Sequence, residues 1–203
     1  MITLVTPNEQ VRWKRIFQGF GLYFLLTFVI SFVGIVLSPS EYQLTFKPIQ
    51  FLVFLPIALA ITPIQTSAEE LFFRGYLLQG MGLKTRSLLI PILGYSLLFM
   101  LPNLLNPEVK SNLFLIALLY LLLGRFLAVI TVKDNSLELA MGVHAANNLF
   151  AALILNYSNS ALPSPSIIRA SRFDPLSNLI SFIVVAVIFC FVIWKERPSK
   201  RAL

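Results

Sequence analysis

Residues 16–40 contain no charged side chain, and this run limits most strongly how the chain can fold. An α-helix needs about 20 apolar residues to cross the hydrocarbon core of a bilayer. Residues 112–132 contain only Arg125 as a charged residue, and residues 176–194 contain none. Strand-like alternation is absent, and backbone polar groups in lipid need partners within the segment, so these runs predict spanning helices.

The composition also indicates an integral membrane protein. Of the 203 residues, 57% are hydrophobic and 12% are charged, whereas a soluble domain carries about 25% charged residues. The first apolar run is too long for a secretory signal peptide and lacks an Ala-x-Ala cleavage site, so it predicts a retained span. The sequence therefore excludes a soluble domain.

Six apolar segments without an internal repeat predict a single domain over residues 1–203. We expect an all-α membrane protein, a bundle of about six to eight transmembrane or partly spanning helices. The expected segments are approximately 16–38, 49–82, 88–105, 112–132, 136–157 and 176–194.

Segment 49–82 is too long for one simple span, and it contains Pro56 and Pro63. A proline inside a helix removes a hydrogen bond and clashes with the preceding turn. We therefore expect either a bent helix or a second, partial helix that begins at a cap provided by Thr66 or Ser67.

The basic residues predict that both termini are cytoplasmic, because cytoplasmic loops of membrane proteins carry an excess of Lys and Arg. Six crossings place ten basic residues inside, namely Arg12, Lys14, Arg15, Lys84, Arg86, Lys133, Lys195, Arg197, Lys200 and Arg201. Four lie outside, namely Lys47, Lys110, Arg169 and Arg172. We expect these clusters to attract the headgroups of the lipid bilayer and no nucleic acid, in a bacterial plasma membrane.

Two adjacent carboxylates, Glu69 and Glu70, lie inside the second apolar segment, and Arg74 follows four residues after Glu70. Residues four apart share one face of a helix, so Arg74 is expected to pair with Glu70. Glu69 points elsewhere and has no such partner. Ionisable groups at membrane depth pair with one another, line a wet cavity or carry out chemistry. One interpretation is therefore that Glu69 faces a cavity as a base. The alternative is a buried Glu–Arg pair that only fixes helix packing.

Arg125 is the other charge within a predicted span. We expect a structural role for it, either in a pair with Glu138 or a carboxylate of the site, or by extension toward the interface.

Three further polar residues lie in predicted spans. His144 is the only histidine, and Asn148 follows it by four residues, so both side chains point to one side of a helix. Asn103 ends the segment that contains Phe99. Taken singly, each of these side chains also fits a role in hydrogen bonding between helices.

Together these residues supply the parts needed for peptide hydrolysis. Glu69 is the expected base that takes a proton from water, and His144 orients the water or protonates the leaving amine. Glu70 and Arg74 provide electrostatic support, and Asn148 donates to the developing oxyanion. No Ser-centred nucleophile motif accompanies them, which disfavours covalent catalysis.

The sequence resembles the CPBP (Abi) family, which comprises CAAX prenyl proteases and bacteriocin-processing intramembrane proteases. The family pattern is Glu-Glu-x-x-x-Arg, then Phe-x-x-x-His, then His-x-x-x-Asn/Asp, over roughly residues 50–157 here. Glu69-Glu70-x-x-x-Arg74 matches the first part and His144-x-x-x-Asn148 the third. The resemblance implies an intramembrane endopeptidase whose first Glu activates water, acting on a membrane-associated peptide or protein substrate.

The second part departs from the pattern, because Asn103 stands where the family has a histidine. An amide does not shuttle a proton near neutral pH and is a poor ligand for a transition metal. Zinc, with Glu69 and His144 as candidate ligands, would have one histidine where such sites usually have more nitrogen or sulfur ligands. We therefore disfavour a tightly bound zinc but leave a divalent metal open. Asn103 is expected either to position the water or bind the oxyanion, or to lie outside the site, because it falls near the outer end of its span and His144 nearer the inner end of its own.

The missing histidine keeps two other function classes open. The first is a catalytically impaired family member that acts as a membrane scaffold or a bacteriocin-immunity protein. The second is a small transporter, which would also use buried Glu and Arg. We favour it less because no inverted repeat pairs two broken helices.

Overall fold

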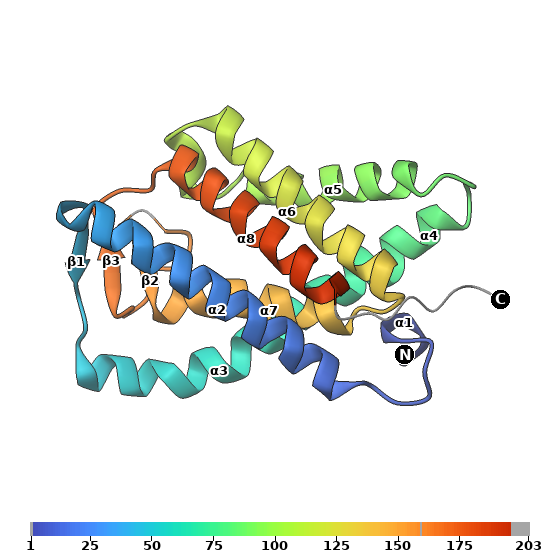
Figure 1. The fold of residues 1–203 in the computed structure, drawn as a ribbon, viewed down its shortest axis with the longest axis horizontal. Coiled ribbons are helices and arrows are strands. Elements are labelled where there is room, and N and C mark those ends of the chain that lie inside the picture. The colour runs from blue at the N-terminus through green and yellow to red at the C-terminus, as the bar shows by residue number, and fades with distance from the viewer. Residues whose placement is uncertain (1, 159, 196–203) are drawn as a thin grey trace.

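The protein is a bundle of six long helices with short strands at one end (Figure 1), seen in a computed structural model that describes residues 2–158 and 160–195. The basic residues Arg197, Lys200 and Arg201 lie outside the described residues. The helices are α1 (Ile2–Val5), α2 (Trp13–Leu37), α3 (Pro48–Glu70), α4 (Gln79–Gly82), α5 (Leu89–Asn103), α6 (Leu113–Asp134), α7 (Glu138–Leu153) and α8 (Pro175–Lys195). A π-helix, η2 (Leu71–Leu78), joins α3 to α4. Two short segments, η1 (Pro39–Glu41) and η3 (Pro107–Lys110), are 3₁₀-helices.

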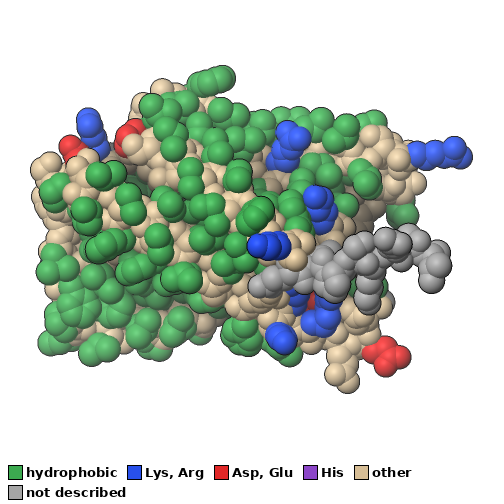
Figure 2. Space-filling view, in the orientation of Figure 1, with side chains coloured by type: hydrophobic (Ala, Val, Ile, Leu, Met, Phe, Trp, Pro, Cys, Tyr) green, Lys and Arg blue, Asp and Glu red, His purple; other side chains and the backbone are tan. Residues whose placement is uncertain are grey.

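Within the described residues, four helical stretches are long and apolar enough to cross a membrane: α2, the continuous stretch from α3 to α4, α6 and α8. Helix α5 is apolar but shorter. Hydrophobic side chains cover much of the left and central part of the face in Figure 2, and many Lys and Arg side chains lie on the right half. The prediction of an all-α membrane bundle is confirmed.

Helix α7 lies inside the bundle, where α2, α3 and α6 pack against it. Twelve of its sixteen residues are buried. Protein therefore surrounds this helix on several sides, which explains how it accommodates polar side chains such as His144 and Asn147 at this depth.

Two glycines let α2 and α7 approach each other closely. A Cβ added to Gly142 of α7 would lie 2.0 Å from the carbonyl oxygen of Ile16, and one added to Gly19 of α2 would lie 2.5 Å from that of Leu139. Small residues at helix interfaces of membrane proteins allow this kind of contact. This contact holds α7 against α2 at Gly142, which is two residues before His144.

Of the two forms expected for segment 49–82, the second helix that begins at Thr66 or Ser67 is wrong, because α3 runs unbroken from Pro48 to Glu70. Thr66 does not cap a new helix. Its hydroxyl donates to the carbonyl oxygens of Thr62 and Pro63, at 2.9 and 3.3 Å, and so bonds the backbone around the proline. The irregularity comes later, as the π-helix that begins directly after Glu70.

Three short strands lie in loops of the described part of the chain, and no sequence pattern predicted them. Strands β1 (Tyr42–Leu44), β3 (Ile168–Ala170) and β2 (Leu155–Tyr157) form one sheet in that order, with β1 antiparallel and β2 parallel to β3. Strands of three residues are too short for a readable alternation. The sheet ties the segments that follow α2 and α7 to the segment that precedes α8 (Figure 1).

Arg125 does not pair with Glu138. Its side chain is exposed on α6, whereas Glu138 is fully buried and accepts hydrogen bonds from the backbone nitrogen and Nε of Arg12, at 2.6 and 2.5 Å. Arg15 pairs with Asp134 at 2.7 Å. Two of the basic residues assigned to lipid headgroups therefore also join α2 to the junction of α6 and α7.

Candidate active site

Two helices bring the predicted carboxylates and the histidine together. Glu69 and Glu70 form the last turn of α3, and His144 faces them from the neighbouring α7. The distance from Nδ1 of His144 to Oε1 of Glu70 is 2.6 Å, and that from Nε2 to Oε2 of Glu69 is 3.7 Å. Each ring nitrogen thus faces a different carboxylate.

Glu70 and Arg74 form a fully buried ion pair at the base of this group. The guanidinium carbon of Arg74 lies 4.8 Å from the centre of the Tyr95 ring and 5.1 Å from that of Phe99. The Phe99 ring also meets the ring of His144 edge-on, with centres 6.0 Å apart. Removal of a charge from water is costly without a close partner, so this pair keeps Glu70 charged beneath the imidazole.

Glu69 differs from Glu70 in its access. Its side chain is 37% exposed, while that of His144 is 4% exposed. Oε1 of Glu69 accepts a hydrogen bond from the side-chain amide of Gln65, one turn earlier on α3. The other oxygen, Oε2, faces His144. Glu69 is therefore the carboxylate of the pair that a molecule from outside can reach.

Asn148 lies on the same side of α7 as His144 and donates from Nδ2 to Oε1 of Gln65 at 3.4 Å. An amide nitrogen carries two hydrogens. One remains for another acceptor beside Glu69, as the role of oxyanion donor requires.

Asn103 takes part in a different set of hydrogen bonds. Its Nδ2 donates to the carbonyl oxygen of Phe99 at 2.8 Å, and its Oδ1 accepts from Asn106 at 3.3 Å. Asn106 also donates to the hydroxyl of Tyr120, which in turn donates to the buried Glu108 at 2.7 Å. None of the hydrogen bonds of Asn103 within the described part of the chain reaches Glu69, Glu70 or His144.

The residues at this point fit a zinc ion poorly. They offer one imidazole, and its Nδ1 is already engaged by Glu70. Within residues 2–158 and 160–195, no three His, Cys, Asp or Glu side chains are grouped as a metal site needs. Zinc sites usually combine three or four ligands with His or Cys predominant.

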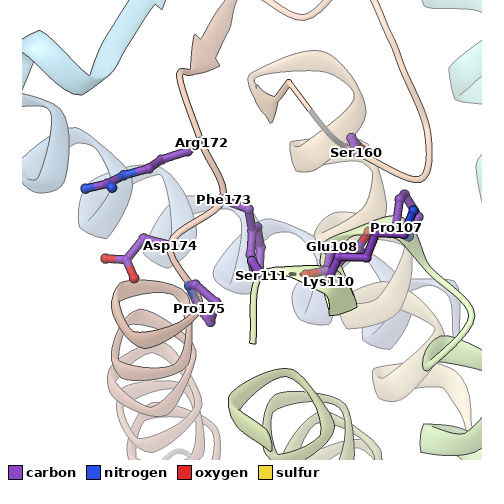
Figure 3. A pocket seen from close by; sticks show the side chains of 9 residues that line it. All are labelled: Pro107, Glu108, Lys110, Ser111, Ser160, Arg172, Phe173, Asp174 and Pro175. Atoms are coloured by element: carbon purple, nitrogen blue, oxygen red, sulfur yellow. Dashed lines mark hydrogen bonds between the residues drawn. The ribbon is translucent and has the colours of Figure 1, made fainter. Parts of the chain in front are cut away.

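A cavity of about 750 Å³ lies apart from these residues, where η3, the chain around Ser160 and the start of α8 meet. Its lining residues are Pro107, Glu108, Lys110, Ser111, Ser160, Arg172, Phe173, Asp174 and Pro175. In Figure 3 the Phe173 ring lies between Asp174 and the pair of Glu108 and Lys110. None of the predicted site residues lines this cavity.

The comparisons with known proteins agree with the resemblance seen in the sequence. Residues 48–150 match the family described as type II CAAX prenyl endopeptidase Rce1-like. The chain belongs to this family. It is also 36% identical over 201 residues to the uncharacterized protein YyaK of Bacillus subtilis (strain 168), an alignment that covers 98% of this chain and 67% of YyaK. No solved structure matches.

The segment that matches the Rce1-like family runs from the start of α3 through most of α7, and it contains all six predicted site residues. Membership supports a function of the CAAX intramembrane protease type. The apolar helices and the family also agree that this Rce1-like chain is an integral membrane protein.

Sequence reasoning missed Gln65 in this Rce1-like site. The available signal was spacing, because Gln65 precedes Glu69 by four residues, as Glu70 precedes Arg74. The side chain of Gln65 is uncharged, so the rule that singles out ionisable groups in an apolar segment does not apply to it.

Proposed function

We propose that the protein is an intramembrane endopeptidase that hydrolyses peptide bonds with a water activated by Glu69. The observation that carries this proposal is the 3.7 Å separation of Oε2 of Glu69 from Nε2 of His144, with Glu69 partly exposed. This gap is too long for a direct hydrogen bond. It is short enough for one water to lie within hydrogen-bond reach of both groups.

The reaction then needs only groups that face this gap. Glu69 takes one proton from the water, and the water oxygen bonds to the carbonyl carbon of the substrate. The carbonyl oxygen becomes an oxyanion, and Asn148 donates to it. When the carbon–nitrogen bond breaks, the proton passes to the leaving nitrogen by way of Glu69 or His144, which yields a carboxylic acid and an amine.

Glu70 and Arg74 act beneath this centre. A carboxylate only accepts hydrogen bonds, so Nδ1 of His144 carries a proton toward Glu70. Nε2 is then the ring atom that is left to exchange a proton. The ion pair with Arg74 keeps Glu70 ionised and so keeps the imidazole in this orientation.

The proposed substrates are peptides or protein segments that reach the site from the lipid bilayer. We place both termini in the cytoplasm of a bacterium, on the balance of basic residues between the two sides. The Bacillus relative supports a bacterial plasma membrane.

The test of the proposal is Glu69→Gln, which keeps the shape of the side chain and removes the base. We expect a loss of roughly 100-fold or more in kcat with unchanged folding. Purified protein in proteoliposomes would be given lipid-anchored CAAX peptides and membrane-spanning peptides, with products identified by mass spectrometry. Glu41→Gln, on an exposed side chain in η1, is the matched control. Full activity of folded Glu69→Gln would remove Glu69 as the base.

The position of Asn103 favours a second candidate, a catalytically impaired member that acts as a membrane scaffold or bacteriocin-immunity protein. The amide replaces a family histidine, and its hydrogen bonds lead away from His144. In that case no peptide is cleaved by the unaltered protein, and Glu69→Gln leaves the cellular phenotype intact.

A further inference from the structure

We propose that Gln65 is a positioning residue for Glu69 and the last amide of a directed hydrogen-bond relay that begins at Tyr23. This inference rests on the proposed role of Glu69 as the base. The side chain of Gln65 bridges two elements of the site: its Nε2 donates to Oε1 of Glu69 on α3, and its Oε1 accepts from Nδ2 of Asn148 on α7 at 3.4 Å.

The relay continues behind Asn148. Oδ1 of Asn148 accepts from Nδ2 of Asn147 at 3.2 Å, and Oδ1 of Asn147 accepts from the hydroxyl of Tyr23 at 3.3 Å. Tyr23 is buried on α2, only 2% exposed. The relay therefore crosses three helices, α2, α7 and α3, and ends at the carboxylate of Glu69.

Every bond in the relay points in one direction. The Tyr23 hydroxyl and the three amides each donate to the next member, and the ionised carboxylate at the end can only accept. A carboxylate at the end fixes which way the Gln65 amide faces, because only its nitrogen can donate. The amide oxygen of Gln65 then faces Asn148, and the same rule orients Asn148 and Asn147 in turn.

The relay occupies Oε1 of Glu69 and leaves Oε2 directed toward His144. Glu69 needs this because it lacks the ion-pair partner that Arg74 gives to Glu70. An exposed Glu side chain without a partner samples several rotamers, and ordering it costs free energy. Gln65 thus supplies the orientation that the proposed proton transfer requires.

Loss of Gln65 should lower kcat and leave KM nearly unchanged, because the residue orients the base. We expect Gln65→Ala to reduce kcat on the order of 10- to 100-fold, the scale of a misplaced catalytic group. Gln65→Glu should be at least as severe, since it removes the donor and adds a like charge beside Glu69. Gln50→Ala, on an exposed glutamine near the start of the same helix, is the matched control.

A double-mutant cycle distinguishes a relay from a general structural role. Tyr23→Phe removes only the hydroxyl that starts the relay, so it should lower kcat in the unaltered protein. In the Gln65→Ala background only the part of this loss that acts through Asn148 should remain, because the path to Glu69 is already cut. Fully additive losses in kcat would overturn the relay, and so would a Gln65→Ala variant with unchanged kcat.

The two proposals fail in different ways. Activity that is independent of Glu69 refutes the proposed base, whereas activity that depends on Glu69 but not on Gln65 refutes only the relay.

Infrared spectroscopy gives a readout that needs no turnover. The difference spectrum between the unaltered protein and Glu69→Gln isolates the carboxylate stretch of Glu69, and this band should shift in Gln65→Ala. A band at the same frequency would overturn the relay.

Discussion

At the scale of single residues, the two adjacent carboxylates have different surroundings. Glu70 is fully buried and contacts Arg74 and His144. Glu69 is 37% exposed; among the described residues its carboxylate accepts from the amide of Gln65, and Nε2 of His144 lies 3.7 Å away. One residue of helix, a rotation of about 100°, therefore separates the buried, ion-paired carboxylate from the partly exposed one that we propose as the base.

This difference predicts unequal effects of substitution on the free energy of unfolding. Glu70→Gln leaves the buried guanidinium of Arg74 without a carboxylate, and loss of one partner of a buried ion pair costs about 3–5 kcal/mol. Glu69→Gln removes no ion-pair partner of Arg74 and should change the unfolding free energy by less than about 1 kcal/mol. Thermal unfolding in detergent would compare the two variants. Equal midpoints would show that the pair with Arg74 does not stabilise the fold.

The sequence predicted the pairing of Glu70 with Arg74 because both lie on one helix, and that contact is confirmed. It placed His144 on a helix but did not predict its distance from either carboxylate, because the contact with Glu70 spans 74 residues of sequence. Asn103 bonds to Phe99 and Asn106, which are four and three residues away. Its place relative to His144 depends on how α5 packs against α6, which local spacing does not encode. The roles of Asn103 and Asn148 stay predictions.

At the scale of helices, the contact between α2 and α7 sets the position of the histidine. The backbone of α2 lies where a side chain at Gly142 would project, and it cannot yield as a flexible side chain would. The next residues of α7 carry His144 toward α3. The distance between the imidazole and Glu69 thus depends on how closely these two helices pack.

We expect Gly142→Ala to destabilise the fold by about 1–3 kcal/mol, the usual cost of extra atoms in a packed interior. It should also reduce cleavage, because α7 must move away from α2. Gly21→Ala on α2 is the control, since a Cβ there meets nothing within 4 Å. Thermal unfolding and turnover of both variants would be measured. A Gly142→Ala variant as stable and active as Gly21→Ala would show that the close contact is not required.

Hydrophobic length located the helices well, because a span needs a continuous apolar run. All six expected segments contain a helix. The proline rule allowed a second helix after Pro63, but the helix continues there, and Thr66 donates to the backbone carbonyl oxygens of Thr62 and Pro63. The residue types carry no signal of the π-helix after Glu70.

At the scale of the whole molecule, ion pairs join the start of α2 to the junction between α6 and α7. Arg12 contacts Asp134 and Glu138, which follow it by 122 and 126 residues. Contacts so distant in sequence close the bundle at the end where α7 begins. The basic residues near the first span therefore have a structural role in addition to their expected effect on orientation.

Arg12→Ala should destabilise the protein more than Lys14→Ala. Glu138 is fully buried and loses its guanidinium in the first variant, and hydrogen bonds to charged groups contribute about 1.5–3 kcal/mol. Arg12 is itself partly exposed, so solvent screening places the expected loss at the lower end of this range. Lys14 is exposed and changes the charge of the segment equally. Unfolding in detergent at low and high salt would compare them, and equal losses would contradict the role of the ion pair.

The single imidazole of the chain makes the proposed reaction centre visible to spectroscopy. Histidine labelled with ¹⁵N at both ring positions gives two resonances, and both belong to His144. One nitrogen faces Glu70 and the other faces Glu69. Each carboxylate of the pair can therefore be monitored through its own nucleus, without assignment of the remaining spectrum.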